Sequence, residues 1–178
     1  MLEGLGASTV AVKTPAALEG LDAIVLPGGE STTISLLLRS AQLERPLFEA
    51  IRGGMACLGT CAGLVLLAST VLDGREDQVP LGLLDVTVRR NGYGRQLQSF
   101  EAKCSGLGPL SGDSIAAAFI RAPVIEALGD GVEVLATLDA EVPHPVVLVR
   151  HGKVLAGTFH PELMGEDRVH RYLLELCG

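Results

Sequence analysis

Residues 55–65 read Met55-Ala-Cys-Leu-Gly-Thr-Cys61-Ala-Gly-Leu-Val65. The pattern predicts a buried strand that turns sharply into a helix, with Cys61 at the turn and a glycine close by on either side. Small neighbours are needed there because the backbone crowds itself at such an elbow. The partial positive charge at the helix start would stabilise negative charge on the sulfur. We interpret Cys61 as a candidate nucleophile, with a buried structural cysteine as the alternative.

The composition indicates one domain with an aliphatic core. The chain has 178 residues, and 48% of them are hydrophobic but only 3% aromatic, so a single domain over residues 1–178 is expected. A formal net charge of −7 offers no basic surface for phosphates, which argues against a nucleic-acid partner. The four cysteines form no CxxC pair, which is typical of a reduced, cytoplasmic protein. His144, His151 and His170 lack ligand spacing with any cysteine, so no metal site is expected.

Residues 53–72 contain no charged side chain and are long enough to cross a bilayer. Their four glycines, two threonines and one serine favour a buried strand, turn and helix instead. The start of the chain also lacks the basic segment and apolar run of a signal peptide. We therefore expect a soluble, cytoplasmic protein without membrane association.

Short aliphatic runs alternate with helical patterns, which predicts an α/β fold: a three-layer, mostly parallel, flavodoxin-like sheet flanked by helices. The first half has expected strands at residues 9–12, 23–26 and 55–58, and helices at 32–39, 46–52 and 62–68. The second half has expected strands at residues 84–89, 99–103, 115–120, 132–137, 146–150 and 154–159, and a helix at 168–176. Because several of these later strands alternate apolar and polar residues, we expect an antiparallel extension. Ser31 is expected to cap one helix and Pro46 to open the next.

The opening of the chain is unusual for such a fold. Met1-Leu-Glu-Gly-Leu-Gly is typical of the end of a helix, whereas open α/β domains usually begin with a central strand. The first strand and helix are therefore expected to be missing, through a truncation or a mis-assigned start.

A second candidate group is His160-Pro161-Glu162, directly after the expected strand 154–159. In an extended segment, residues i and i+2 project to the same side, so the Glu162 carboxylate can orient the His160 imidazole and stabilise its protonated form. An ordinary surface histidine at a strand end is the alternative. Together with the cysteine elbow, the pair predicts a catalytic triad of Cys61, His160 and Glu162.

Two further segments can hold a charged ligand. Residues 27–32, Pro-Gly-Gly-Glu-Ser-Thr, follow a strand and open a helix, and their N–H groups can bind an oxyanion. They lack the lysine of a P-loop, and a glycine turn with a serine cap is the alternative. Residues 89–96, Arg-Arg-Asn-Gly-Tyr-Gly-Arg-Gln, and Arg121 supply guanidinium groups that suit a carboxylate, unless they are solvated surface charges.

Residues 27–32, 59–63 and 160–162 together resemble the class I, or triad, glutamine amidotransferases. Gly-Gly-Glu-Ser-Thr-Thr, Gly-Thr-Cys-Ala-Gly-Leu, Arg-Asn-Gly-Tyr-Gly-Arg-Gln, Ser-Phe-Glu-Ala and Phe-Ile-Arg-Ala-Pro occur in this order. That order is similar to the glutaminase subunits of pyridoxal 5′-phosphate synthase, from about Gly6 to the end. The resemblance implies a single glutamine amidotransferase-like domain.

The resemblance also implies a reaction, the hydrolysis of L-glutamine to glutamate and ammonia without a cofactor. Cys61 would be the nucleophile, His160 the base and Glu162 its orienting partner. Backbone N–H groups of Gly29 and Ala62 would form the oxyanion hole. Glutamine would be bound by Gly29, Glu30, Ser31, Arg90, Ile120 and Arg121.

A partner is implied as well. In this family the ammonia passes to a separate synthase subunit of a hetero-oligomer that builds pyridoxal 5′-phosphate, the vitamin B6 cofactor, and the glutaminase is nearly silent until that subunit binds. Two other hypotheses stay open from the residues. One is a stand-alone cysteine hydrolase or peptidase on a similar scaffold, and the other is an inactive binding fragment.

Overall fold

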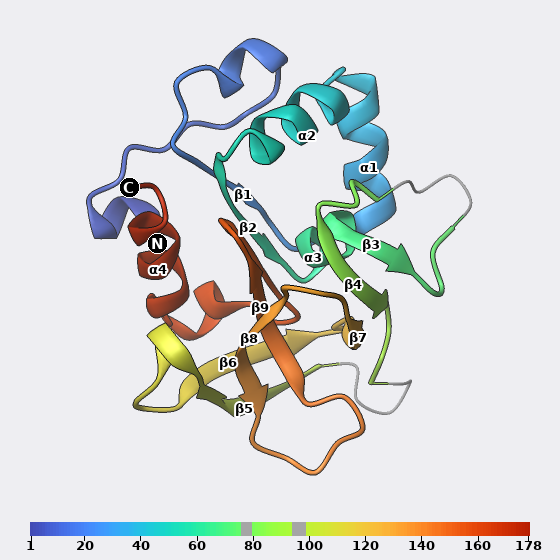
Figure 1. Ribbon diagram of the computed structural model, residues 1–178, viewed down its shortest axis with the longest axis vertical. Helices are drawn as coiled ribbons and strands as arrows, with labels where there is room; N and C mark the ends of the chain where they lie inside the picture. Colours follow the sequence, from blue (N-terminus) through green and yellow to red (C-terminus); the bar gives the residue numbers. More distant parts are fainter. Residues whose placement is uncertain (76–79, 94–98) are drawn as a thin grey trace.

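The computed structural model describes residues 1–75, 80–93 and 99–178 (Figure 1). In the labels below, η marks a 3₁₀ helix. The first half of the chain forms η1 Leu2–Leu5, η2 Pro15–Leu18, β1 Ala23–Leu26, α1 Ser31–Ser40, α2 Glu44–Arg52, β2 Ala56–Thr60, α3 Ala62–Leu67 and β3 Ala68–Val71. The second half forms β4 Leu84–Arg89, β5 Ser99–Gly106, η3 Gly108–Leu110, β6 Ile115–Ile120, β7 Val124–Leu128, β8 Glu133–Leu138, β9 Val146–His151, β10 Val154–Gly157, η4 Pro161–Met164 and α4 Arg168–Glu175.

The described strands form two sheets. The larger sheet has seven strands in the order β1-β2-β10-β9-β8-β5-β6. Strands β1, β2 and β10 are parallel, and pairing is antiparallel from β10 to β6. The smaller sheet, β3-β4-β7, has one parallel and one antiparallel pair. The α/β fold, its flanking helices and its antiparallel extension are confirmed, but the large sheet is mixed rather than mostly parallel, with only β1, β2 and β10 in its parallel part. Short connections such as residues 151–153 join antiparallel neighbours, whereas parallel neighbours need a longer crossover.

Helices cover both faces of the large sheet, with α4 on one side and α1, α2 and α3 on the other (Figure 1). Strand β2 is buried at all five positions and lies between two parallel neighbours, as expected for a central strand. Its alternate side chains point to opposite faces. Leu58 belongs to the apolar cluster under α4, and Cys57 to the cluster under α2 and α3. The end of β2 is therefore held from both sides.

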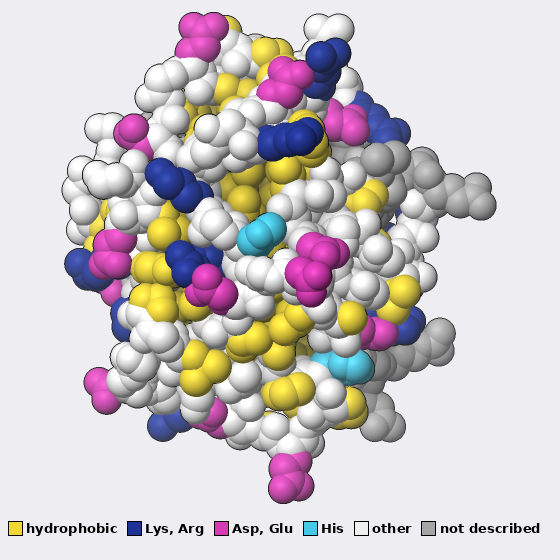
Figure 2. Space-filling view, viewed as in Figure 1, with side chains coloured by type: hydrophobic (Ala, Val, Ile, Leu, Met, Phe, Trp, Pro, Cys, Tyr) yellow, Lys and Arg dark blue, Asp and Glu magenta, His cyan; other side chains and the backbone are white. Residues whose placement is uncertain are grey.

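Charged side chains are dispersed over the face that Figure 2 shows. Lys and Arg side chains lie scattered among Asp and Glu, and apolar side chains reach the surface between them. The described residues on this face form no continuous basic stripe of the kind that follows a phosphate backbone.

Most of the predicted elements occur within two residues of their expected bounds. Strands β1, β4 and β6 have the predicted bounds, and β5 runs three residues further than predicted. Residues 151–153 form the hairpin turn between the two strands predicted on either side of them: β9 and β10 pair antiparallel, and Gly152 has a φ of 57°. A left-handed residue at this turn favours glycine.

One predicted strand does not occur in the described residues, and two observed strands were not predicted. Residues 9–12 form no strand in the described structure, and Val10 is 61% exposed. An aliphatic run becomes a strand only where another strand accepts its backbone hydrogen bonds. Conversely, β3 and β7 were not predicted, because β3 continues from α3 without a turn and β7 begins directly after Pro123. Only their pairing with β4 defines them.

Helices α1 and α2 begin one and two residues earlier than predicted. The cap of α1 is Glu30 rather than Ser31, because the Glu30 carboxylate accepts hydrogen bonds from the N–H groups of Thr32 (3.1 Å) and Thr33 (2.6 Å). A carboxylate reaches two free N–H groups at once and its charge suits a helix N-terminus. The cap therefore lies inside the ligand-binding segment predicted from the sequence.

Glu166 and Arg168 tie the start of α4 to the loop before β6. The guanidinium of Arg168 donates to both carboxylate oxygens of Glu166 and to the backbone carbonyls of Asp113 and Ser114. We expect Arg168→Ala to lower the free energy of unfolding by about 2 kcal/mol, because the nearly buried Glu166 carboxylate loses its partner. Urea unfolding measures this change.

Arg171→Ala is the matched control for the Arg168 clamp, the set of hydrogen bonds from Arg168 to Glu166, Asp113 and Ser114. Arg171 pairs with Asp167 at 2.8 Å on the same helix, but both side chains are exposed. Its removal should change the free energy of unfolding by less than about 0.5 kcal/mol. Equal losses in the two variants would show that the Arg168 clamp contributes no more than a surface ion pair.

Candidate active site

Cys61 lies where β2 ends and α3 begins. Its φ of 51° and ψ of −101° lie in a region that a residue with a side chain rarely adopts. Its N–H donates to the carbonyl of Gly157 in β10 at 2.8 Å, which holds the turn against the neighbouring strand. The predicted strand–turn–helix elbow is confirmed, with the backbone strain at the residue that carries the thiol.

Two glycines allow this elbow to close. A Cβ on Gly63 would lie 2.1 Å from the carbonyl oxygen of Leu26, and one on Gly59 would lie 2.7 Å from the carbonyl carbon of Gly63. Both distances are far below van der Waals contact. Only glycine therefore lets α3 pack this closely against β1 and β2.

Strand β10 is parallel to β2 and adjacent to it, so it brings His160 to the same end of the sheet as Cys61. The backbone N–H of His160 donates to the carbonyl of Ala118 in β6 at 2.8 Å. Nδ1 of His160 lies 2.9 Å from Oε1 of Glu162. Glu162 lies in the 3₁₀ turn η4 rather than in an extended segment, because Pro161 has a fixed φ and no N–H and so starts a helical turn.

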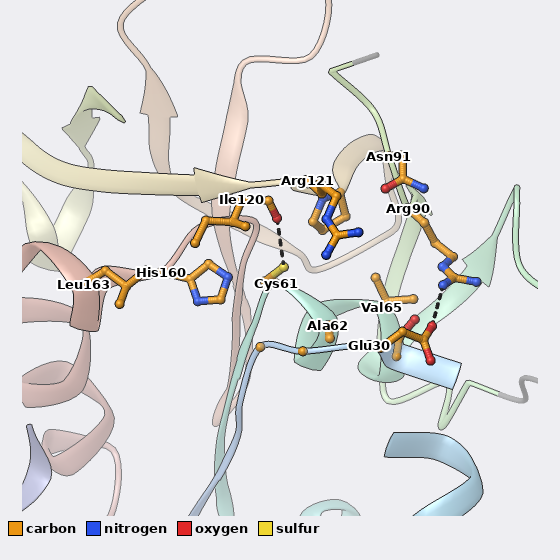
Figure 3. A pocket seen from close by; sticks show the side chains of 14 residues that line it. Glu30, Cys61, Ala62, Val65, Arg90, Asn91, Ile120, Arg121, His160 and Leu163 are labelled. Carbon is orange, nitrogen blue, oxygen red and sulfur yellow. Dashed lines mark hydrogen bonds and ion pairs between the residues drawn. The ribbon is translucent and has the colours of Figure 1, made fainter. Parts of the chain in front are cut away.

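Figure 3 shows the imidazole of His160 next to Cys61, and Nδ1 of the same ring contacts the Glu162 carboxylate. Hydrogen bonds to Cys61 and to Glu162 outweigh the effect of burial and raise the pKa of His160 to about 9. Burial acts to raise the pKa of Glu162, but the hydrogen bond with His160 and neighbouring backbone and charges bring it below its ordinary value. These contacts therefore stabilise the protonated form of the ring, which is the form that His160 takes when it accepts a proton.

This pairing predicts a pH-dependent stability. A histidine whose pKa is raised from 6.5 to about 9 by folding contributes stability in full below pH 6.5 and loses it as the pH rises through about 9. The wild type should have a larger free energy of unfolding than His160→Gln at low pH. We expect this difference to decrease as the pH rises from 6.5 to about 9. Urea unfolding of both proteins in a series of buffers measures it. An advantage that stays constant with pH would contradict the pairing.

A cavity of about 610 Å³ opens beside Cys61 (Figure 3). Its size is within the range of small-molecule sites. Its lining consists of Gly28, Gly29, Glu30, Ser31, Cys61, Ala62, Val65, Arg90, Asn91, Ile120, Arg121, Pro123, His160 and Leu163. The residues assigned to the triad, the oxyanion hole and glutamine binding all line this cavity except Glu162, which reaches it through His160.

The glycine loop passes directly over the His160 ring. A Cβ on Gly28 would lie 2.1 Å from Cε1 of His160, and Gly29 has a φ of 147°, so a side chain is excluded at both positions. Ala62, which lines the same cavity, is the first residue of α3, and its N–H has no partner within the helix. N–H groups from both segments are therefore available to an oxyanion bound next to Cys61.

Glu30 and Arg90 contact each other on the side of the cavity away from His160 (Figure 3). Nη2 of Arg90 donates to Oε1 of Glu30 at 2.8 Å. The hydrogen bonds of Thr33 are the main cause that lowers the pKa of Glu30 to about 2. Arg121 follows β6 with a φ of 42° and faces the same space. Charges of both signs thus border the cavity opposite the thiol.

Five lining residues were not among the predicted site residues: Gly28, Val65, Asn91, Pro123 and Leu163. Asn91 and Pro123 lie inside the two arginine-containing segments, so their positions in the sequence could have indicated that they line the cavity. Val65 is one helical turn after Cys61, where helical periodicity would have indicated it. Gly94, Arg95 and Gln96 of the predicted arginine segment lie outside the described residues.

Three further findings concern disulfides, metal binding and membrane-spanning helices. All four cysteines are free. Within residues 1–75, 80–93 and 99–178, no group of three or more His, Cys, Asp and Glu side chains could hold a metal ion. In the same described ranges, every helix is too short or too polar to span a bilayer.

Comparison with known proteins places the chain in a family. It matches the SNO glutamine amidotransferase family over residues 1–178. It is 47% identical to the pyridoxal 5′-phosphate synthase subunit PdxT of Nocardioides sp. (strain ATCC BAA-499 / JS614), covering 99% of this chain and 87% of the relative. It is 53% identical to the PdxT subunit of Cutibacterium acnes, covering 96% and 86%.

Solved structures agree with this comparison. A crystal structure described as glutamine amidotransferase superimposes with a TM-score of 0.89 at 47% identity, covering 99% of this chain and 90% of that one. The structure of PurLQS from Thermotoga maritima shares the fold, with a TM-score of 0.61 at 16% identity, covering 90% and 82%. This chain, with its cysteine elbow and glycine loop, belongs to the SNO glutamine amidotransferase family.

Proposed function

We propose that the protein hydrolyses L-glutamine to glutamate and ammonia with a triad of Cys61, His160 and Glu162. The ammonia is delivered to a synthase subunit that builds pyridoxal 5′-phosphate. The observation that carries the proposal is the meeting of the strained cysteine, the histidine–carboxylate pair and the glycine loop at one cavity. The family and the similarity to PdxT subunits support glutamine as the substrate.

The first half of the reaction forms a thioester. Cys61 gives its proton to His160, and Sγ attacks the side-chain amide carbon of glutamine. The N–H groups of Gly29 and Ala62 stabilise the negative oxygen of the tetrahedral intermediate. When the C–N bond breaks, His160 returns the proton to the nitrogen. Ammonia leaves, and the glutamyl group stays on the sulfur.

The second half releases glutamate. A water molecule attacks the thioester carbon while His160 accepts its proton. The C–S bond then breaks, and the proton passes from the imidazole to the sulfur. A pKa of about 9 suits His160 to accept a proton in both halves, and the 2.9 Å contact with Glu162 supports an orienting role for that carboxylate.

We assign the two charged groups of the substrate by charge. The α-carboxylate would meet the guanidinium groups of Arg90 and Arg121, whose planar fork matches a carboxylate. The α-amine would meet Glu30, which stays ionised because of its low pKa. Ser31 and Ile120 complete the walls of the cavity. Free thiols in all four cysteines support a cytoplasmic location for the reaction.

Glutamate and ammonia release, measured with and without an added synthase subunit, tests the proposal. We expect slow release by this chain alone and an increase of at least about tenfold with the synthase, equivalent to about 1.4 kcal/mol in the barrier. A stand-alone hydrolase or peptidase would turn over other amides, such as asparagine and short peptides, and would ignore the synthase. An inactive binding fragment would release nothing under either condition.

A further inference from the structure

Four of the six aromatic side chains form one contact cluster, and two of them directly precede residues that line the cavity. The chain has only four phenylalanines, two tyrosines and no tryptophan. The cluster consists of Tyr93, Phe100, Phe119 and Phe159. Phe119 directly precedes Ile120, and Phe159 directly precedes His160. Apart from these residues and Tyr172 on α4, the buried core clusters are aliphatic, so most of the buried aromatic residues adjoin the site.

Tyr93 reaches this cluster from the segment after β4. Its ring meets Phe100 of β5 edge-on at 5.1 Å between centroids, and Phe119 of β6 edge-on at 5.8 Å. Phe100 and Phe119 themselves stack at 4.6 Å. Edge-to-face pairs are favourable because the positive edge of one ring faces the negative face of another. The Tyr93 ring therefore docks its own segment onto β5 and β6.

The backbone beside Tyr93 makes the same connection. The N–H of Gly92 donates to the carbonyl of Ala122 at 3.2 Å. A Cβ on Gly92 would lie 2.3 Å from the methyl carbons of Val124, so the two segments touch directly. Ala122 follows Arg121, and Gly92 follows Asn91. Figure 3 shows Arg90, Asn91 and Arg121 on neighbouring parts of the cavity wall.

We propose that Tyr93 is a positioning residue for glutamine binding, whose ring docks the segment that carries Arg90 onto the strand that carries Arg121. This inference rests on the proposed function. The role concerns substrate binding and not the chemical step. Cys61 and His160 are positioned by a different contact, because they follow β2 and β10, and these two strands pair with each other in the central sheet. The ring performs this role, because it makes the edge-on contacts with Phe100 and Phe119 that join the two segments.

Three variants test the inference in the glutaminase assay with the synthase subunit present. We expect Tyr93→Leu to raise KM for glutamine about tenfold and to leave kcat within about twofold, because a displaced binding group costs affinity rather than chemistry. Tyr93→Phe keeps the ring, so its KM should stay within about twofold of the wild type. Tyr172→Leu is the matched control, since the other tyrosine lies in the same apolar cluster but on α4. Its KM should not change.

Two results would overturn the inference: an equal KM in Tyr93→Leu and Tyr172→Leu, or a loss of kcat in Tyr93→Leu without a change in KM. If Tyr93→Leu does not fold, Phe100→Leu replaces it, because that change removes the nearest ring from Tyr93. A raised KM in Phe100→Leu supports the inference and an unchanged KM overturns it. A wild type that releases no ammonia with the synthase contradicts the proposed function itself, whereas an active wild type with unaffected variants contradicts only the role of Tyr93.

Discussion

Replacing Cys61 with alanine is expected to reduce glutamine hydrolysis by at least about ten-thousand-fold, with the synthase subunit present. Without the sulfur no thioester forms, and the remaining groups can only orient a water molecule that attacks the amide directly. The glycine loop and the Ala62 N–H would still bind the oxyanion, so the residual rate measures what that electrostatic stabilisation achieves alone. Ammonia release, with single-turnover detection for the slow variant, gives the comparison.

Cys57→Ala is the control for this experiment. Cys57 lies on β2 four residues before Cys61, is fully buried, and has its thiol pKa raised by burial. It belongs to the apolar cluster under α2 and α3 and does not line the cavity. Its replacement should leave kcat within about twofold. Glutamine hydrolysis by Cys61→Ala at a rate close to that of Cys57→Ala would refute the covalent mechanism.

The second large effect is expected on stability. Gly63→Ala should lower the free energy of unfolding by about 3 kcal/mol or more, the upper part of the range for overpacked sites. The added methyl group would lie 2.1 Å from the carbonyl oxygen of Leu26, and this backbone atom cannot rotate away as a side chain could. Relief requires α3 to move off β1, which displaces Cys61 as well. Urea unfolding and the activity of any folded fraction report the two consequences.

Gly4→Ala provides the comparison for Gly63→Ala. Gly4 lies in η1 and is exposed, and a methyl group added there would have no neighbouring atom within 4 Å. The same chemical change at this position should alter the free energy of unfolding by less than about 0.5 kcal/mol. A Gly63→Ala protein as stable as Gly4→Ala would mean that α3 does not pack on β1 as closely as described.

Much of the site could be predicted from the sequence because its parts are local. Glycines on both sides of Cys61 are required by the sterics of one turn, and that requirement is visible in eleven consecutive residues. His160 and Glu162 are two residues apart, so their contact needs no distant strand, only the turn that Pro161 starts. The apolar composition of the residues before Cys61 indicates a buried strand. Each of these features depends on residues that are close together in the sequence, so it does not depend on the order of the strands in the sheet.

Other features depend on contacts between segments that are distant in the sequence, and no local pattern specifies these contacts. Residues 9–12 have the composition of a strand but no described partner strand, while β3 and β7 exist because β4 lies between them. The ion pair of Glu30 and Arg90 joins residues sixty positions apart. Such pairings are chosen by which segments the whole fold brings into contact, and the free energy that selects them is spread over many long-range contacts.

The sequence by itself therefore determined the elbow with its candidate nucleophile and the histidine–carboxylate pair, since each follows from sterics and hydrogen bonding within a few residues. Only the tertiary structure decided that β10 stands beside β2, which brings His160 to Cys61. It also decided that Tyr93 packs on Phe119, which joins the two arginine-bearing segments. The physical reason is the same in both cases: strand pairing and core packing act between segments distant in the chain, where no local pattern specifies the partner.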